Sequence, residues 1–235
     1  MCNKITRIIH QIWSEIDEPL PKHFKMLSKT WKKDYPDWRY ESWNNAKMNN
    51  FVLEHYPEYW NMYKSFPYNV QRWDTIRYLI LYKMGGMYVD FDYQSLEPMD
   101  ILIENRECCF AEEEAYINEK GESVSYFNNA LIFSVPGHPF IKMIIDTIFL
   151  ETTNLPITLQ KNEYVLNTTG PGMISRLYTV LSPLQKESIY IIPAKYVTPF
   201  SVGQAKMVRN GYKGPEIEEC LKDAYAIHYF WGGWL

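Results

Sequence analysis

Apolar positions recur along the chain at both helical and strand spacing, which predicts a mixture of helices and strands. The clearest helix covers residues 68–84, and its regularly spaced apolar residues are Val70, Trp73, Ile76, Ile80 and Met84. Gly85 follows at the position where a glycine commonly ends a helix. A strand is expected at residues 87–91, directly after this helix. Two carboxylates, Asp90 and Asp92, mark the end of that strand.

The remaining elements are expected from shorter patterns. Strands are expected at residues 5–13, 38–43, 107–111, 126–135, 188–192 and 224–230. Helices are expected near residues 20–33, 46–55, 140–150 and 170–181, with a further short helix starting at Pro57. An acidic hairpin or loop is expected at residues 112–123, and irregular or loop-rich structure is expected at residues 151–163 and 193–215. This mixture favours the α/β class, and 235 residues suit a single domain over residues 1–235.

Composition narrows the class of function only slightly. Aromatic residues make up 16% of the chain, with 8 Trp and 19 Tyr. Such rings fill cores, and they also stack on bases or on the C–H faces of sugars, so both interpretations stay open. The formal net charge of −4 argues against general nucleic-acid binding.

The cysteine pattern and the apolar runs indicate a compartment. Cys2, Cys108, Cys109 and Cys220 show neither a disulfide framework nor a zinc-binding spacing, which is typical of free thiols in a reducing compartment. No signal-peptide core and no apolar run of membrane-spanning length is visible. We therefore expect a cytoplasmic protein.

The helix expected at residues 20–33 has two distinct faces. Its apolar face carries Leu20, Phe24, Leu27 and Trp31. A second face is basic and carries Lys22, Lys25, Lys29, Lys32 and Lys33. A basic face of this kind is either a solvated surface or a dock for an anionic membrane or a lipid-diphosphate acceptor.

Asp90 and Asp92 would face the same side of the strand if the strand continued through them. Two carboxylates this close repel, and a hard divalent cation such as Mg²⁺ or Mn²⁺ would relieve the repulsion. The natural substrate for a cation held in this way is a diphosphate, whose leaving charge the metal neutralises. The alternative is a solvated turn, where Asp is also common.

Asp74 and Arg77 lie one helical turn apart on the preceding helix, so they share a face. Arginine makes forked contacts with phosphate, and aspartate accepts hydrogen bonds from sugar hydroxyls. The alternative is an ordinary ion pair on the helix surface, which contributes little.

The order of these residues resembles a known family. Asp74-x-x-Arg77, followed by Gly85-Gly86-x-Tyr88-x-Asp90-x-Asp92, is similar to the DXD sugar transferases related to yeast initiation α-1,6-mannosyltransferases and α-1,4-galactosyltransferases. The spacing of the charged residues also resembles that of the clostridial glucosylating toxins. Other matching blocks, in the family's order, are Ile8–Trp13, Trp31, Trp43, Asn128-Asn129-Ala130, Gly137-His138-Pro139, Thr169-Gly170-Pro171 and His228 with its neighbouring tryptophans.

The resemblance implies a GT-A fold with a Rossmann-like mixed sheet flanked by helices. It implies a nucleotide-sugar donor, either a UDP- or a GDP-sugar, with UDP-galactose, UDP-glucose or UDP-GlcNAc favoured. It also implies Mn²⁺ or Mg²⁺ and a hexose transfer that retains the anomeric configuration. Because no membrane anchor is visible, we expect a bacterial-type enzyme of capsule or other surface polysaccharide synthesis. Its acceptor would be a glycan or lipid-linked saccharide at the inner face of the membrane.

The resemblance also assigns roles to residues. The implied donor-binding positions are Ile12, Trp13, Asp74, Arg77, Tyr88, Asp90, Asn128, Asn129 and Trp231. The implied metal positions are Asp90, Asp92 and His228, and the implied catalytic group is Asp74, Arg77, Asp90 and Asp92. Trp13 would stack on the base, and Trp231 would close over the diphosphate. The family's terminal Ser-Trp pair is absent from His228-Tyr-Phe-Trp231-Gly-Gly-Trp234-Leu235, so the third protein ligand of the metal is open.

Several other interpretations remain. The chain could be a non-catalytic binding relic of the same fold, although such a relic need not keep the four charged residues. A metal-dependent phosphodiesterase would need more clustered His and Asp ligands than we find. Trp13 could be core filler and His228 a core histidine, and we interpret His10 and His138 as structural. The acidic run of residues 112–114 favours a solvated loop over a catalytic base.

Overall fold

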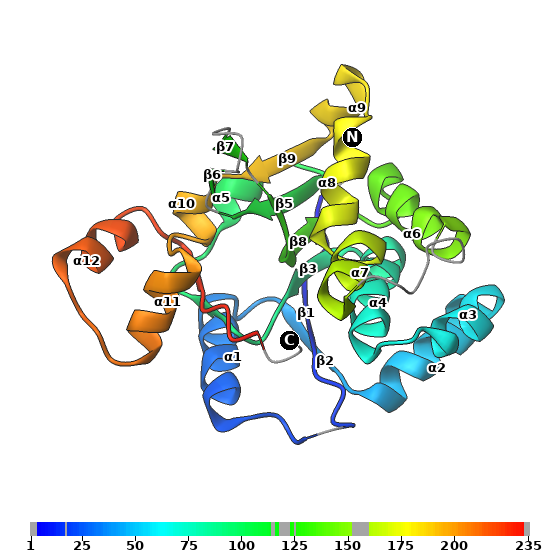
Figure 1. Cartoon of the computed structure of the whole chain (residues 1–235), viewed down its shortest axis with the longest axis horizontal. Helices are drawn as coiled ribbons and strands as arrows, with labels where there is room; N and C mark the ends of the chain where they lie inside the picture. The colour runs from blue at the N-terminus through cyan, green and yellow to red at the C-terminus, as the bar shows by residue number, and fades with distance from the viewer. Residues whose placement is uncertain are drawn as a thin grey trace.

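A six-stranded mixed sheet forms the centre of the protein (Figure 1). The computed structural model describes residues 4–16, 18–113, 116–117, 123–124, 126–151 and 160–232. Across the sheet the strands are β2 (Arg39–Trp43), β1 (Ile8–Ile12), β3 (Gly86–Val89), β8 (Phe127–Ser134), β5 (Cys108–Glu112) and β9 (Ile189–Ile192). β1 runs parallel to β2 and β3, β8 runs antiparallel to β3 and β5, and β5 is parallel to β9. The expected mixed α/β sheet is therefore confirmed.

Helices cover both faces of this sheet (Figure 1). The helices on one face are α2 (Asn45–His55), α4 (Asn69–Met84), α6 (Pro139–Glu151) and α8 (Pro171–Thr179). The elements on the other face include α1 (Lys22–Asp34), α5 (Asp100–Ile103) and α10 (Ala194–Val197). Side chains of β3 alternate between the two cores, with Tyr88 in the first and Met87 and Val89 in the second.

Two small sheets lie outside the central one. β4 (Tyr93–Ser95) pairs antiparallel with β10 (Ala226–His228), which sets His228 opposite Tyr93. The C-terminal part of the chain is thereby brought beside the turn that follows β3. The second small sheet pairs β6 (Tyr116–Ile117) with β7 (Ser123–Val124).

The structure contains short helices that the sequence patterns did not predict. The expected loop at residues 193–215 instead holds α10, α11 (Val202–Arg209) and the first residue of α12 (Pro215–Leu221). α7 (Lys161–Thr168) begins inside the segment expected to be irregular, whose residues 152–159 lie outside the described ranges. α9 (Pro183–Glu187) was not predicted either, whereas the short helix expected to start at Pro57 is confirmed as η1 (Pro57–Tyr59), followed by α3 (Trp60–Ser65).

The expectation at residues 193–215 was wrong because Pro and Ser there start helices. Pro215 occupies the first turn of α12, and the Ser201 hydroxyl accepts a hydrogen bond from the Gln204 backbone N–H at the start of α11. Helices of only four to eight residues are too short to show a periodic apolar pattern.

The glycine pair joins α4 to β3 in a way that other residues would obstruct. Gly85 and Gly86 have φ values of 65° and 102°, in the region that favours glycine. A Cβ on Gly86 would lie 2.5 Å from the Ile8 carbonyl oxygen of β1. The pair therefore lets the chain leave α4 and enter the sheet directly, as the glycine after the helix suggested.

The described cysteines, Cys108, Cys109 and Cys220, are free thiols. Within the described ranges, no helix combines the length and the apolar character needed to cross a membrane.

His10 lies in the core of β1 and should make stability depend on pH. Its Nδ1 accepts from Trp43 Nε1 at 3.2 Å, and its Nε2 donates to the Gly85 carbonyl oxygen at 3.0 Å. Because one nitrogen accepts and the other donates, both hydrogen bonds require the neutral ring. Burial lowers the pKa of His10 to about 4 from its ordinary 6.5. The unfolded chain therefore takes up a proton first as the pH falls, and protonation favours unfolding.

We expect this residue to remove about 2 kcal/mol from the free energy of unfolding between about pH 7.5 and pH 5. Urea unfolding of the wild type and of His10→Gln at the two pH values measures the effect. The variant should show a smaller loss of stability over this interval. An equal loss in both proteins would contradict the assignment.

Candidate active site

Asp90 and Asp92 lie in a turn at the end of β3. The strand ends at Val89, and the Tyr93 backbone N–H donates to the Asp90 carbonyl oxygen at 3.2 Å. The strand expected at residues 87–91 therefore ends earlier than predicted, and the condition under which both aspartates would face one side of a strand is not met. Their carboxylates still influence each other: burial raises the pKa of Asp90, Arg77 opposes this rise, and the charge of Asp92 adds to it.

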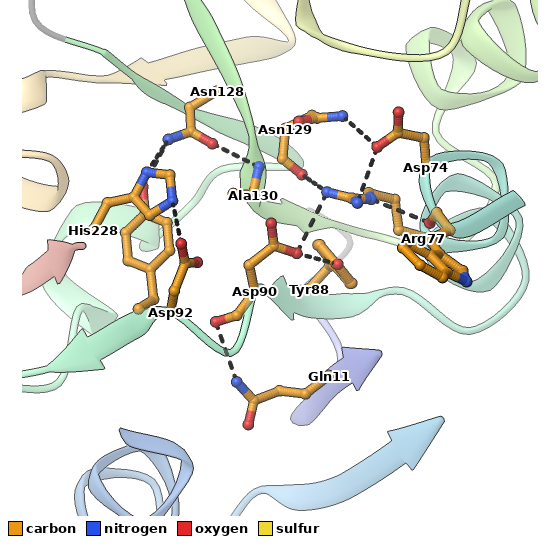
Figure 2. Close-up of polar contacts among 12 residues, drawn as sticks. Gln11, Asp74, Arg77, Tyr88, Asp90, Asp92, Asn128, Asn129, Ala130 and His228 are labelled. Atoms are coloured by element: carbon orange, nitrogen blue, oxygen red, sulfur yellow. Dashed lines mark hydrogen bonds and ion pairs between the residues drawn. The ribbon is translucent and has the colours of Figure 1, made fainter. Parts of the chain in front are cut away.

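Arg77 connects the aspartate of α4 to the aspartate of the turn (Figure 2). Its guanidinium lies 2.9 Å from Asp74 Oδ1 and 3.5 Å from Asp90 Oδ1. It also donates to the Asn129 carbonyl oxygen at 2.7 Å and lies over the ring of Tyr88 at 4.5 Å from the ring centre. These contacts fix the direction of the guanidinium from several sides.

Asp74 is buried and has three polar partners. Its two oxygens accept hydrogen bonds from Asn129 Nδ2 at 3.0 Å and from Thr169 Oγ1 at 2.9 Å, in addition to the contact with Arg77. Burial raises the pKa of Asp74 to about 6, although these partners favour its charged form. The side chains of Asp74 and Arg77 are only 6% and 7% exposed, so the alternative of a surface ion pair is wrong.

Tyr88 and Gln11 support Asp90 from the sheet (Figure 2). The Tyr88 hydroxyl donates to Asp90 Oδ1, and Gln11 Nε2 donates to the Asp90 carbonyl oxygen at 3.3 Å. Both residues come from strands that end at this edge of the sheet, β3 and β1. Ile12, the last residue of β1, is half-buried and packs against the core below the site.

Asp92 is held by the C-terminal part of the chain. Its Oδ2 lies 3.3 Å from His228 Nε2 and accepts from the Trp231 backbone N–H at 2.9 Å. Burial would raise the pKa of Asp92, but the charge and the hydrogen bonds of these neighbours keep it below its usual range. In return, Asp92 raises the pKa of the His228 ring against the effect of burial.

Asn128 (Figure 2) and Tyr93 complete the surroundings of His228. Asn128 Nδ2 lies 3.2 Å from His228 Nδ1 and donates to the Tyr93 hydroxyl at 3.0 Å. The Tyr93 ring stacks on the His228 ring with 6° between their planes. His228 is therefore a buried histidine with polar neighbours at both ring nitrogens.

The two tryptophans expected to contact the donor both pack against Phe24 near the start of α1. The Trp231 ring stacks on His23 at 4.3 Å, and Trp231 is 39% exposed. The guanidinium of Arg209 lies over the Trp231 ring and donates to the Tyr229 carbonyl oxygen. Trp13 is half-buried and makes edge contacts with Phe24 and Phe91, and its stacking on a base stays a prediction. Trp234 lies outside the described residues.

The acidic run is not simply a solvated loop. Glu112 ends β5 and accepts from the Ala194 backbone N–H at 3.4 Å. Burial raises the pKa of Glu113, and the charge of His228 partly offsets this rise. Glu113 is therefore close enough to the site to interact with it, whereas Glu114 lies outside the described residues.

The donor chemistry of the turn fits a hard divalent cation in part. Asp90 and Asp92 supply carboxylate oxygens, which Mg²⁺ and Mn²⁺ prefer. Each carboxylate keeps one oxygen that the side-chain and C-terminal contacts above do not use. Within the described ranges, however, no three His, Cys, Asp or Glu side chains form a group that could hold a metal ion. The aspartate pair therefore fits the cation, and the implied set with His228 does not form such a group.

Several supporting residues were missed at the sequence level. Tyr78 accepts from Asn129, Tyr93 stacks on His228, and Arg209 holds the C-terminal segment. Thr169 stood within a matching block, so the resemblance could have suggested its role. The other three carry no local pattern that distinguishes them from core or surface residues.

Known proteins share both the sequence pattern and the fold. The family described as glycosyltransferase sugar-binding region containing DXD motif matches residues 21–108, which include the four charged site residues. Inositol phosphoceramide mannosyltransferase 1 of Schizosaccharomyces pombe is 30% identical over 185 residues, covering 72% of this chain and 54% of that protein. The initiation-specific α-1,6-mannosyltransferase of Candida albicans is 25% identical over 281 residues, covering 96% and 71%.

The chain spans about half the length of the inositol phosphoceramide mannosyltransferases that it matches. Among solved structures, the ligand-free glycosyltransferase domain of the YGT toxin has a TM-score of 0.58 with 10% identity, covering 81% of this chain and 80% of that one. A likeness at this identity concerns the fold alone, and it agrees with the expected GT-A fold.

Proposed function

This chain belongs to the glycosyltransferase family whose sugar-binding region contains a DXD motif, and we propose that it transfers a hexose from a nucleotide sugar in a metal-dependent reaction. One observation carries the proposal. Buried Arg77 joins Asp74 to Asp90 at the edge of the sheet where β1 and β3 end. Asp92 follows Asp90 by two residues, so it lies in the same turn. Ligands of open α/β sheets bind at this edge.

The charged residues suit different parts of a nucleotide sugar. Asp74 offers a carboxylate to sugar hydroxyls, and Arg77 offers a fixed guanidinium to the diphosphate. Asp92, with Asp90 beside it, would hold Mn²⁺ or Mg²⁺. When bound, the cation neutralises the negative charge of the leaving diphosphate. Asn129 and Asn128 would lie near the donor sugar, and Trp231 would lie over the diphosphate.

We propose transfer with retention of configuration. The bond from the anomeric carbon to the phosphate oxygen breaks, and its electron pair leaves with the nucleoside diphosphate. The acceptor oxygen attacks the same face of the sugar, and its proton passes to the departing phosphate. This route needs no dedicated base, whereas an inverted product would require one and would contradict it.

For the donor sugar we propose mannose as the first candidate, because the relatives named above are mannosyltransferases. The UDP-hexoses favoured from the sequence remain further candidates for the donor. For the acceptor we propose a lipid-linked or glycan hydroxyl, since several relatives are named for inositol phosphoceramide. The free cysteines are consistent with a reducing compartment, and we propose action at the cytoplasmic face of a membrane.

Transfer itself tests this function. GDP-mannose, UDP-glucose, UDP-galactose and UDP-GlcNAc would be offered with inositol phosphoceramide, with phosphatidylinositol and with short oligosaccharides. Product mass and anomeric configuration are the readouts, with Mn²⁺ or with EDTA. We expect one donor to give a retained glycoside only when metal is present. A metal-independent product would contradict the metal-dependent proposal.

The basic face of α1 suits contact with an anionic membrane. All five of its lysines are exposed, and Met26, at 68% exposure, lies among them on the same face. His23, on the first turn of α1, stacks on Trp231, whose backbone binds Asp92. A lipid surface bound here would therefore lie beside the proposed donor site.

Charge reversal tests this contact. Each lysine near an anionic surface contributes about 1 kcal/mol, so Lys25→Glu, Lys29→Glu and Lys33→Glu together should weaken binding to phosphatidylinositol-containing vesicles by at least about tenfold. Co-sedimentation measures the change, and phosphatidylcholine vesicles provide the neutral surface. The matched control reverses three exposed lysines outside α1, Lys83, Lys206 and Lys213. Equal weakening in both variants would contradict a specific role for α1.

The non-catalytic relic remains the rival proposal. It predicts nucleotide binding without turnover for every donor and acceptor tried. A two-metal phosphodiesterase has less support, because the described residues contain no three-membered group of metal-binding side chains.

A further inference from the structure

His228 is held in one orientation on three sides. Its Nδ1 lies 3.2 Å from Asn128 Nδ2, and its Nε2 lies 3.3 Å from Asp92 Oδ2 (Figure 2). One face of the ring stacks on Tyr93 at 4.4 Å. The residue is only 8% exposed, so the ring cannot turn without breaking these contacts.

The amide of Asn128 determines which ring nitrogen carries the proton. The Ala130 backbone N–H donates to Asn128 Oδ1 at 2.6 Å, so an amide turned the other way would set two donors against each other. Nδ2 therefore faces His228, and it also donates to the Tyr93 hydroxyl. Because an amide nitrogen only donates, Nδ1 of His228 must accept, and the proton of the neutral ring lies on Nε2.

We propose that Asn128 fixes His228 as the Nε2–H tautomer, so that His228 positions Asp92 as a hydrogen-bond donor and is not a ligand of the metal. This inference rests on the proposed function, since it concerns the same metal and diphosphate site. A metal-binding histidine presents an unprotonated nitrogen to the metal and donates its other N–H to a carboxylate, carbonyl or water. Here the nitrogen that faces Asp92 carries the proton, and the other nitrogen faces a donor.

The composition of the site agrees with this role. Mg²⁺ is commonly held by one or two carboxylates together with substrate phosphates and water. Asp90 and Asp92 can supply the carboxylates without a histidine. His228 and the Trp231 backbone N–H both engage Oδ2 of Asp92, which leaves the second oxygen to face a cation.

The first test locates the proton directly. Long-range ¹H–¹⁵N correlation spectra of protein with ¹⁵N-labelled histidine distinguish the two tautomers, and the signal missing in His228→Gln identifies His228. At a pH above the raised pKa of His228, where the ring is neutral, we expect a protonated Nε2 and an unprotonated Nδ1, both without metal and with Mg²⁺ plus UDP or GDP. An unprotonated Nε2 in either state would overturn the inference. The metal-free spectrum tests the tautomer of His228 even if no nucleotide binds. A failure of this inference can therefore be told apart from a failure of the proposed function.

A variant of Asn128 tests whether this residue sets the tautomer. In Asn128→Asp a carboxylate oxygen faces Nδ1 and accepts a hydrogen bond, so a proton should appear on Nδ1. A purely structural Asn128 would leave the ring spectrum unchanged, and that result would overturn its positioning role.

The affinity for Mn²⁺ gives an independent readout. Glutamine places an amide donor near the position of Nε2, so His228→Gln should keep the Mn²⁺ affinity measured with nucleotide within about threefold of wild type. Even weakening a ligand through its supporting contacts costs about 10-fold to 100-fold in affinity. A loss well beyond 100-fold in His228→Gln, in protein with an unchanged melting temperature, exceeds what a lost supporting contact costs and would show that His228 ligates the metal.

Discussion

Asp92→Asn should reduce sugar transfer by about 10²-fold to 10³-fold, because the variant loses the charge that holds the cation on the leaving diphosphate. Asparagine keeps the size of the side chain and can still accept from the Trp231 backbone N–H, so the fold should survive. Turnover at saturating donor and Mn²⁺ measures the effect, and circular dichroism checks the fold. Asp37→Asn, an exposed aspartate outside the site, is the matched control and should behave as wild type. Activity of Asp92→Asn within about threefold of wild type would mean that the metal is held elsewhere.

Arg77→Met should have two large effects. Removing the guanidinium leaves the buried carboxylate of Asp74 without its cation, and breaking a buried pair costs about 3–5 kcal/mol in the free energy of unfolding. It also removes the cation aimed at the diphosphate, which should lower turnover by about 10³-fold. Urea unfolding and turnover measure the two effects separately.

Arg77→Lys distinguishes charge from geometry. Lysine keeps the charge but cannot contact Asp74, Asp90 and the Asn129 carbonyl oxygen with one planar group. We expect much of the stability to return and most of the activity to remain lost. Arg72→Met, on the same helix but bonded to Asn69, is the control for the loss of an arginine from α4. Full activity in Arg77→Lys would contradict a role for the fixed guanidinium.

The parts of the fold that carry a strong local pattern were predictable. The 16-residue helix α4 has a long apolar repeat, and the glycine pair after it marks the entry to β3. β1, β5 and β8 are rich in apolar residues and were placed to within a few residues. By contrast, α10 and α11 are too short for periodicity, and the three-residue strand β4 is recognisable only from its partner β10.

The candidate site was predictable only in outline. Asp74, Arg77 and Asp90 do come together, as their spacing around the glycine pair suggested. Asp90 and Asp92 were expected to face one side only if the strand continued through them, and the structure instead ends the strand at Val89 and sets their positions by a turn. The partners of Asp74 come from positions 55 and 95 residues further along the chain, and local pattern does not reveal contacts over such distances.

The metal ligands, too, could be predicted from the sequence only in outline. The resemblance grouped His228 with the two aspartates, and the structure does bring it beside Asp92. Which of its nitrogens carries a proton depends on Asn128 and on the Ala130 backbone N–H, neither of which the spacing of the motif identifies.

The central claim is that the turn after β3 holds a metal-bound nucleoside diphosphate, and calorimetric titration tests it most directly. The wild-type protein would be titrated with UDP and with GDP, each in Mn²⁺ and in EDTA. We predict that one nucleotide binds in Mn²⁺ and that its affinity falls by at least about tenfold in EDTA. Binding of neither nucleotide in Mn²⁺, or equal binding with and without the metal, would contradict the account.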